Sequence, residues 1–271
     1  MQARIHFISG LPRSGSTLLA AILRQNPRFH AGMTGPIGSL IDANLRVMSM
    51  SNETAIYITD KQREALLRNI FSTYYADIPN GDVVFDTNRN WCARLSLLAE
   101  LFPDARIICC VRDVPWIFDS IERLIRNNKF QPSGIFSFEP GGTVYSRVEG
   151  LAGSNGMVGF AWNALREAFF SEYTDRIMAL TYETLTTRPD LALEAVYDFI
   201  GEKLFQHDFE NVEFDAEEFD RRLGTPGLHR VSRQVRPSSR RSLLPGDLVR
   251  KYENDAFWRD PARNPHNVRV V

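Results

Sequence analysis

The segment RIICCV at residues 106–111 constrains the fold of this chain more than any other. After its first residue it is apolar on both faces, which is typical of a parallel strand that helices cover on both sides. Shorter apolar runs at Ile5–Ser9, Val83–Phe85 and Ile177–Leu180 alternate with segments whose apolar residues have helical spacing. We therefore predict an α/β fold of three layers, with a central parallel sheet flanked by helices.

The predicted helices fill the segments between these runs. We expect Asp60 to cap the second helix, because Asp is a favoured N-cap residue. The last helix should end at Gly201. The segments concerned are Ser16 to about Gln25, Asp60–Tyr75, Trp91–Phe102, Pro115–Ile125, Val158–Phe170 and Leu191–Ile200.

Length and charge exclude several classes of protein. The chain has 271 residues, within reach of one large α/β domain, and we predict a single domain over residues 1–271. Its 32 basic and 33 acidic residues give a net charge of −1, so no global basic field attracts nucleic acid. No run of 18 apolar residues is present, and hence we expect no membrane span. The start of the chain lacks a signal-peptide pattern, and two of its three cysteines are adjacent in an apolar run, which favours a cytoplasmic location.

Two stretches break the strand–helix alternation. Residues 128–156 are rich in Gly and aromatic residues with little periodicity, and we interpret them as a lid or acceptor-binding loop. The part from about Gly224 is rich in Arg, Pro and Ser, and we interpret residues 224–260 as an Arg-rich closing segment.

The strongest motif is GLPRSGST at residues 10–17, between the first predicted strand and the first predicted helix. Backbone N–H groups of a Gly-containing turn, together with a helix N-terminus, form a phosphate cradle. The spacing of its glycines is that of a Walker A loop, but Ser16 stands where that motif has Lys. The cation of this loop is instead Arg13.

PRSGST after an apolar strand resembles the 5′-phosphosulfate loop of sulfotransferases that use 3′-phosphoadenosine 5′-phosphosulfate (PAPS). It is closest to the P-R-S-G-T-T form of protein-tyrosine sulfotransferases and many bacterial relatives. The resemblance implies an α/β domain related to P-loop nucleotide kinases, PAPS as co-substrate and no metal requirement. It assigns to the 5′-phosphosulfate Arg13, Ser14, Gly15, Ser16 and Thr17.

Three later features match the same family. It has an Arg at the end of a buried strand and a Ser eight residues later, both binding the 3′-phosphate, and Arg112 and Ser120 have this spacing. It has a Tyr against the adenine, which Tyr182 in LTYE matches. It closes over the 3′-phosphate with a late Ser/Arg/Lys segment, for which Ser232 and Arg241 are our candidates. On their own, each of these residues could equally be a structural strand-end or surface residue.

The proton acceptor is the least defined part of the predicted site. Met33 and Thr34 replace the acidic pair from which the protein-tyrosine branch draws its base. Ligands of open α/β sheets bind beyond the carboxyl ends of the strands. We therefore name Asp86 as the candidate base and Arg89 as a candidate ligand of the sulfuryl oxygens, with His30 as a second candidate base. Alternatively, Asp86 caps a following helix and Arg89 is structural.

The resemblance predicts a sulfotransferase that transfers the sulfuryl group from PAPS to a hydroxyl or phenol acceptor: a small molecule, carbohydrate, lipid or peptide tyrosine. Sulfuryl transfer needs less charge neutralisation than phosphoryl transfer, so Arg13 and backbone dipoles can stabilise the leaving phosphate. Two alternatives remain open. One is a nucleotide kinase or NTPase with a degenerate loop, and the other is a non-catalytic nucleotide-binding member of the fold.

Overall fold

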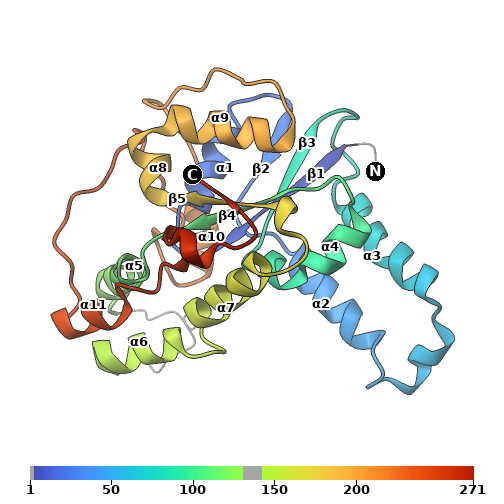
Figure 1. Cartoon of the computed structure of the whole chain (residues 1–271), viewed down its shortest axis with the longest axis horizontal. Coiled ribbons are helices and arrows are strands. Elements are labelled where there is room, and N and C mark those ends of the chain that lie inside the picture. The colour runs from blue at the N-terminus through green and yellow to red at the C-terminus, as the bar shows by residue number, and fades with distance from the viewer. Residues whose placement is uncertain (1–2, 131–141) are drawn as a thin grey trace.

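Six parallel strands form the central sheet of the computed structural model, which describes residues 3–130 and 142–271 (Figure 1). Every neighbouring pair of strands is parallel. The predicted α/β fold with a helix-flanked parallel sheet is therefore confirmed. Across the sheet the order is β2 (Phe29–Ala31), β3 (Val83–Thr87), β1 (Arg4–Gly10), β4 (Ile107–Val111), β5 (Ile177–Thr181) and β6 (Arg269–Val270).

Each face of the sheet has its own apolar core, because successive side chains of a strand point to opposite faces. Ile8 of β1 is buried in one core and Phe7 in the other. The first core is covered by α1 (Ser16–Leu23), α8 (Tyr182–Thr187) and α9 (Pro189–Ile200). The second is covered by α2 (Ile37–Val47), α3 (Asp60–Tyr74), α4 (Leu95–Leu101), α5 (Val114–Asn127), α6 (Val144–Ala152), α7 (Met157–Phe169) and α11 (Gly246–Tyr252).

The start of α3 differs from the sequence-based prediction. Thr59, not Asp60, caps this helix: its hydroxyl accepts from the backbone N–H of Gln62 at 3.3 Å. In return, the Gln62 side chain accepts from the Thr59 N–H at 2.8 Å. This reciprocal pair satisfies two helix-end N–H groups at once, which Asp60 one position later does not.

Two other segments differ in detail from the sequence-based prediction. The predicted helix at 91–102 is divided into a 3₁₀ segment, Arg89–Arg94, and the α-helix α4. Within 128–156, residues 131–141 lie outside the described residues, and helix α6 occupies part of the remainder. The closing segment follows a short helix, α10 (Glu217–Arg222), and is anchored by the buried Phe257 and Trp258.

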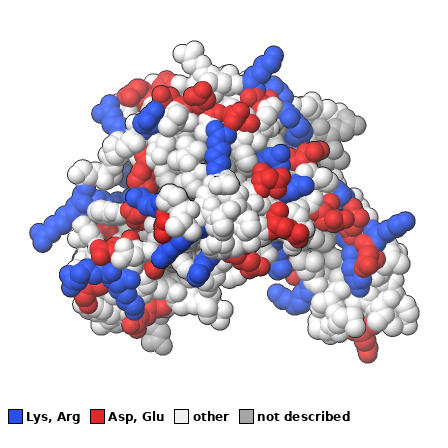
Figure 2. Space-filling model, in the orientation of Figure 1, with Lys and Arg blue, Asp and Glu red and all other residues white. Residues whose placement is uncertain are grey.

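The surface and the cysteines agree with an ordinary globular chain. On the face shown in Figure 2, basic and acidic residues are interspersed rather than segregated. The three cysteines are free and buried. Among the described residues, no helix combines the length and hydropathy needed to cross a membrane.

Gly10 ends β1 where the chain turns into the phosphate loop. Its φ is +99°, and an added Cβ would lie 2.2 Å from the carbonyl oxygen of Cys110 on β4. No side chain fits in that distance, so the end of β1 packs directly on the backbone of β4. This close approach brings the loop after β1 next to the loop after β4.

We expect Gly10→Ala to lower the free energy of unfolding by about 2–5 kcal/mol, because left-handed strain and a backbone collision both act. Gly81→Ala is the matched control: its φ is +87° but no atom lies within 4 Å of the added Cβ. We expect it to cost only about 1–2 kcal/mol, from strain alone. Urea unfolding of both variants measures the difference, and equal losses would contradict the close packing.

Candidate functional site

A cavity of about 700 Å³ opens at the carboxyl ends of β1, β3 and β4. This is where ligands bind in open α/β sheets, at the point where the strand order reverses. Its wall combines segments far apart in the sequence: residues 8–13 and 15–18, residues 34–36, Thr87, Arg89, Arg112, Ser120, Met157, Tyr182, Thr186, and a C-terminal group between Phe219 and Arg240.

Two residues of the loop between β1 and α1 have a left-handed backbone conformation. Arg13 has φ +58° although it is not glycine, and Gly15 has φ +95°. A Cβ at Gly15 would lie 3.0 Å from a ring carbon of Tyr182, so the loop packs against that ring. Helix α1 begins at Ser16, which exposes the N–H groups of its first turn at the cavity. Ser14 is buried beneath the loop, with its hydroxyl donating to the carbonyl of Pro12.

The side chain of Arg13 is held by two neutral partners. Its Nε donates to the Ser120 hydroxyl at 3.1 Å, and its Nη1 donates to the carbonyl of Leu228. Burial, and then the nearby charge of Arg112, lowers the pKa of Arg13 to about 10. The guanidinium is therefore still charged at neutral pH, and among the described residues its hydrogen bonds go to neutral oxygens rather than to a carboxylate.

Arg112 follows β4 and reaches the same loop. Its Nη1 donates to the carbonyl of Arg13 at 3.4 Å, and its guanidinium lies 3.9 Å from the centre of the Tyr182 ring. Its Nε is buried without a hydrogen-bond partner. Arg13, Arg112, Ser120 and Tyr182 therefore surround one cavity.

The cavity wall is strongly cationic. Six arginines line it, and none of its described residues is Asp or Glu. Burial lowers the pKa of Arg89, whose side chain forms no ion pair with any described residue. Arginines beside the N-terminus of a helix can bind a multiply charged anion. Of the six, Arg236 pairs with Glu210 and Arg240 with Asp119, whereas the other four form no ion pair with a described residue. The arginines are Arg13, Arg89, Arg112, Arg230, Arg236 and Arg240.

Asp86, the candidate base, lies outside this wall. Its side chain is buried, one carboxylate oxygen accepting from the Tyr75 hydroxyl at 2.6 Å and the other from Trp91 Nε1 at 2.8 Å. It lies behind Gly35, whose added Cβ would be 4.0 Å from Asp86 Oδ2. It does not cap the following helical turn either, since Asn88 does so. The geometry makes Asp86 an anchor for Tyr75 and Trp91.

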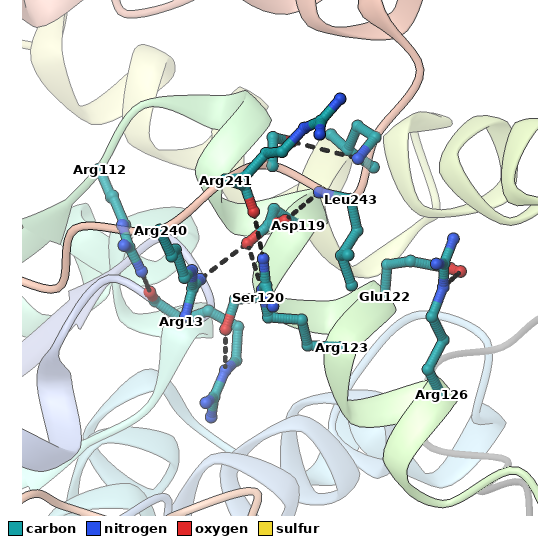
Figure 3. A network of polar contacts seen from close by, with 12 residues as sticks. Arg13, Arg112, Asp119, Ser120, Glu122, Arg123, Arg126, Arg240, Arg241 and Leu243 are labelled. Carbon is teal, nitrogen blue, oxygen red and sulfur yellow. Dashed lines mark hydrogen bonds and ion pairs between the residues drawn. The ribbon is translucent and has the colours of Figure 1, made fainter.

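The closing segment reaches the cavity through a different arginine from the one expected. Ser232 lines the cavity, but Arg241 is exposed and points away from Arg13 and Arg112 in Figure 3. Its neighbour Arg240 lines the wall instead and pairs with Asp119 at 2.9 Å.

Asp119 fixes that segment on α5. It is fully buried, and it also accepts from Arg123 at 3.0 Å and from the backbone N–H of Leu243 at 2.7 Å (Figure 3). A buried carboxylate is stable only with such partners. This network decides which arginine of the segment faces the cavity.

Sequence reasoning missed His229, which also lines the cavity. Its Nδ1 lies 2.6 Å from Oδ1 of the buried Asp220, and its backbone N–H donates to Oδ2 at 2.8 Å. No spacing rule pairs a residue of helix α10 with one nine positions later in a loop. The second candidate base, His30, lies outside the wall and pairs with Asp82 at 2.8 Å.

Comparison with known proteins identifies the family. The family model described as "Sulfotransferase family" matches residues 6–207, about three-quarters of the chain. The chain belongs to the sulfotransferase family. The matched region contains the phosphate loop, Arg112, Ser120 and Tyr182.

Three solved sulfotransferase structures are similar to this chain, and the first of them shares its fold. The sulfotransferase domain from the curacin biosynthetic pathway has a TM-score of 0.51 and 16% identity, with 79% of each chain covered. The sulfotransferase domain of the Synechococcus PCC 7002 olefin synthase has a TM-score of 0.45 and 17% identity, over 93% of this chain and 95% of that one. A sulfotransferase from Alicyclobacillus acidocaldarius has a TM-score of 0.46 and 14% identity, over 82% and 89%. No curated protein matches this chain.

The environment of Asp86 predicts a pH dependence of stability. Burial raises the pKa of this carboxyl, against the two hydrogen bonds, which lower it. From about pH 4 up to the raised pKa the folded state holds more protons than the unfolded state, so rising pH costs stability. Asp86→Asn removes this charge and can still bond to both Tyr75 and Trp91.

We therefore expect the free energy of unfolding of the native protein to fall, relative to that of Asp86→Asn, as the pH rises from about 4 to 7. Urea unfolding at several pH values measures this, and parallel profiles would contradict it.

Asp86→Ala leaves the Tyr75 hydroxyl and the Trp91 N–H without their acceptor. We expect it to lower the free energy of unfolding by about 2–5 kcal/mol, measured by urea unfolding.

Proposed function

We propose that this chain is a PAPS-dependent sulfotransferase that transfers the sulfuryl group to a hydroxyl or phenol acceptor. The observation that carries the proposal is the meeting of Arg13 and Arg112, neither paired with an acid, at one cavity beside the N-terminus of α1. A donor with a phosphosulfate at one end and a phosphate at the other matches two such cations.

The residues present fit this donor. The N–H groups of 15–17 and the guanidinium of Arg13 would hold the 5′-phosphosulfate. The buried, unpartnered Nε of Arg112, together with the Ser120 hydroxyl, would hold the 3′-phosphate, with Ser232 and Arg240 closing over it. The Tyr182 ring, which already carries one stacked guanidinium, would face the adenine.

The chemistry asked of these residues is positioning and charge stabilisation. Arg13 stabilises the charge that develops on the leaving phosphate, and Arg89 neutralises the sulfuryl oxygens. Both side chains are partly buried, which strengthens these interactions relative to open water. We infer that the reaction needs no metal, because the arginines supply the required positive charge.

The kinase alternative requires other residues. It needs a Lys on the β- and γ-phosphates and an acidic ligand for Mg²⁺. Position 16 is Ser, and the described wall of the cavity contains neither Lys nor a carboxylate. The non-catalytic alternative differs from our proposal only in turnover.

We further propose a kinship with the protein-tyrosine type, on the PRSGST form of the loop. On this view residues 1–271 act as one domain, in which 224–260 is the closing segment and 128–156 the lid or acceptor loop.

Binding of the bisphosphate product, 3′-phosphoadenosine 5′-phosphate (PAP), tests the donor assignment. We expect calorimetry in EDTA to detect PAP binding, and Arg13→Ala and Arg112→Ala each to weaken it about 10–100-fold, as for a lost charge-assisted hydrogen bond. Arg106→Ala is the matched control, because Arg106 precedes the opposite end of β4 and packs over Phe199. Preference for ATP over PAP, or Mg²⁺-dependent ATP hydrolysis, would refute the proposal.

A further inference from the structure

We propose that His229, oriented by Asp220, is the group that takes the proton from the acceptor hydroxyl. This inference rests on the proposed function and supplies the proton acceptor that it lacks. The reaction requires such a group, because the acceptor oxygen must lose its proton as it bonds to sulfur.

The composition of the cavity wall is the first argument. Its described residues contain no Asp, Glu, Lys or Cys. The arginines are cations at any working pH and cannot accept a proton. Of the described side chains of the wall, His229 is the one that carries an imidazole, whose neutral form has a nitrogen lone pair that can accept a proton.

The contacts of the imidazole are the second argument. Asp220 is buried and lies 2.6 Å from Nδ1, so Nδ1 carries the hydrogen and the lone pair is left on Nε2. Among the described residues no partner is found for Nε2, and it is not a buried, solvent-excluded atom. The ring also packs edge-on against Phe219, with centroids 5.6 Å apart, which fixes its plane.

The third argument is position. Leu228, the residue before His229, accepts a hydrogen bond from the guanidinium of Arg13. The segment that carries the imidazole is therefore held against the phosphate loop, and His229 lines the same cavity as Arg13. In-line transfer needs the base on the acceptor's side of the sulfuryl group, opposite the leaving phosphate, within this one cavity.

In the proposed step the acceptor oxygen forms a bond to sulfur while the bond from sulfur to the bridging oxygen of the 5′-phosphate breaks. The electron pair of that bond leaves with the bisphosphate. The proton of the acceptor moves to Nε2 of His229, and Asp220 stabilises the resulting imidazolium before the proton passes to solvent.

The kinetic test uses consumption of radiolabelled PAPS, with p-nitrophenol and with water as acceptors. We expect His229→Ala to lower turnover about 10²–10⁴-fold, the range for loss of a general base. PAP affinity should stay within about 3-fold, and added imidazole should restore part of the rate, which it would not do for a purely structural histidine. His30→Ala is the matched control, because His30 is also paired with an aspartate but lies outside the cavity wall.

A second measurement needs no acceptor. The chain has five histidines, so ¹⁵N-labelled imidazole signals can be assigned by substitution. In the PAP complex we expect the neutral imidazole of His229 to carry its hydrogen on Nδ1, and we expect the Asp220→Asn variant to lose this preference. A neutral His229 protonated at Nε2 would overturn the inference.

The outcomes separate the two proposals. If the native protein does not bind PAP, the donor assignment is refuted. PAP binding with His229→Ala as fast as the native protein leaves that assignment intact and overturns only the role of His229. If the native protein uses neither p-nitrophenol nor water as acceptor, the position of the hydrogen on the His229 imidazole decides whether the role of His229 stands.

Discussion

The backbone path after β1 is the constraint on which the site depends. Gly10 packs on the carbonyl of Cys110, and the chain then takes left-handed conformations at Arg13 and Gly15. This path turns the Arg13 carbonyl toward Arg112 and its guanidinium toward Ser120. The two cations meet because β1 and β4 are neighbours whose carboxyl ends share one edge of the sheet.

Two buried carboxylates outside the cavity hold in place the C-terminal group of residues that lines it, between Phe219 and Arg240. Asp119 ties Arg240 and the backbone of Leu243 to α5. Asp220 ties His229 to α10 through both its ring and its backbone. Neither carboxylate lines the cavity, whereas the arginines and His229 do. The described wall therefore remains positive although the whole chain is nearly neutral.

The contrast between Asp86 and His229 shows how burial distinguishes a structural group from a candidate proton acceptor. Both oxygens of Asp86 accept hydrogen bonds, from Tyr75 and from Trp91, and its side chain lies outside the cavity wall. His229 has one nitrogen anchored and the other free of described partners. Residue identity and spacing do not reveal this difference, because it depends on what each side chain touches.

The amino-acid sequence alone determined the layered α/β fold and the place of the loop between β1 and α1, because these follow from local periodicity and short spacing. The resemblance to sulfotransferases named Arg112 and Ser120, and both line the cavity. Tertiary structure alone decided that Arg240 rather than Arg241 faces the cavity, that Asp86 stands behind it, and that Asp220 meets His229. Such contacts depend on how segments without periodicity fold back onto the sheet. That path is set by long-range packing, on which a local pattern carries no information.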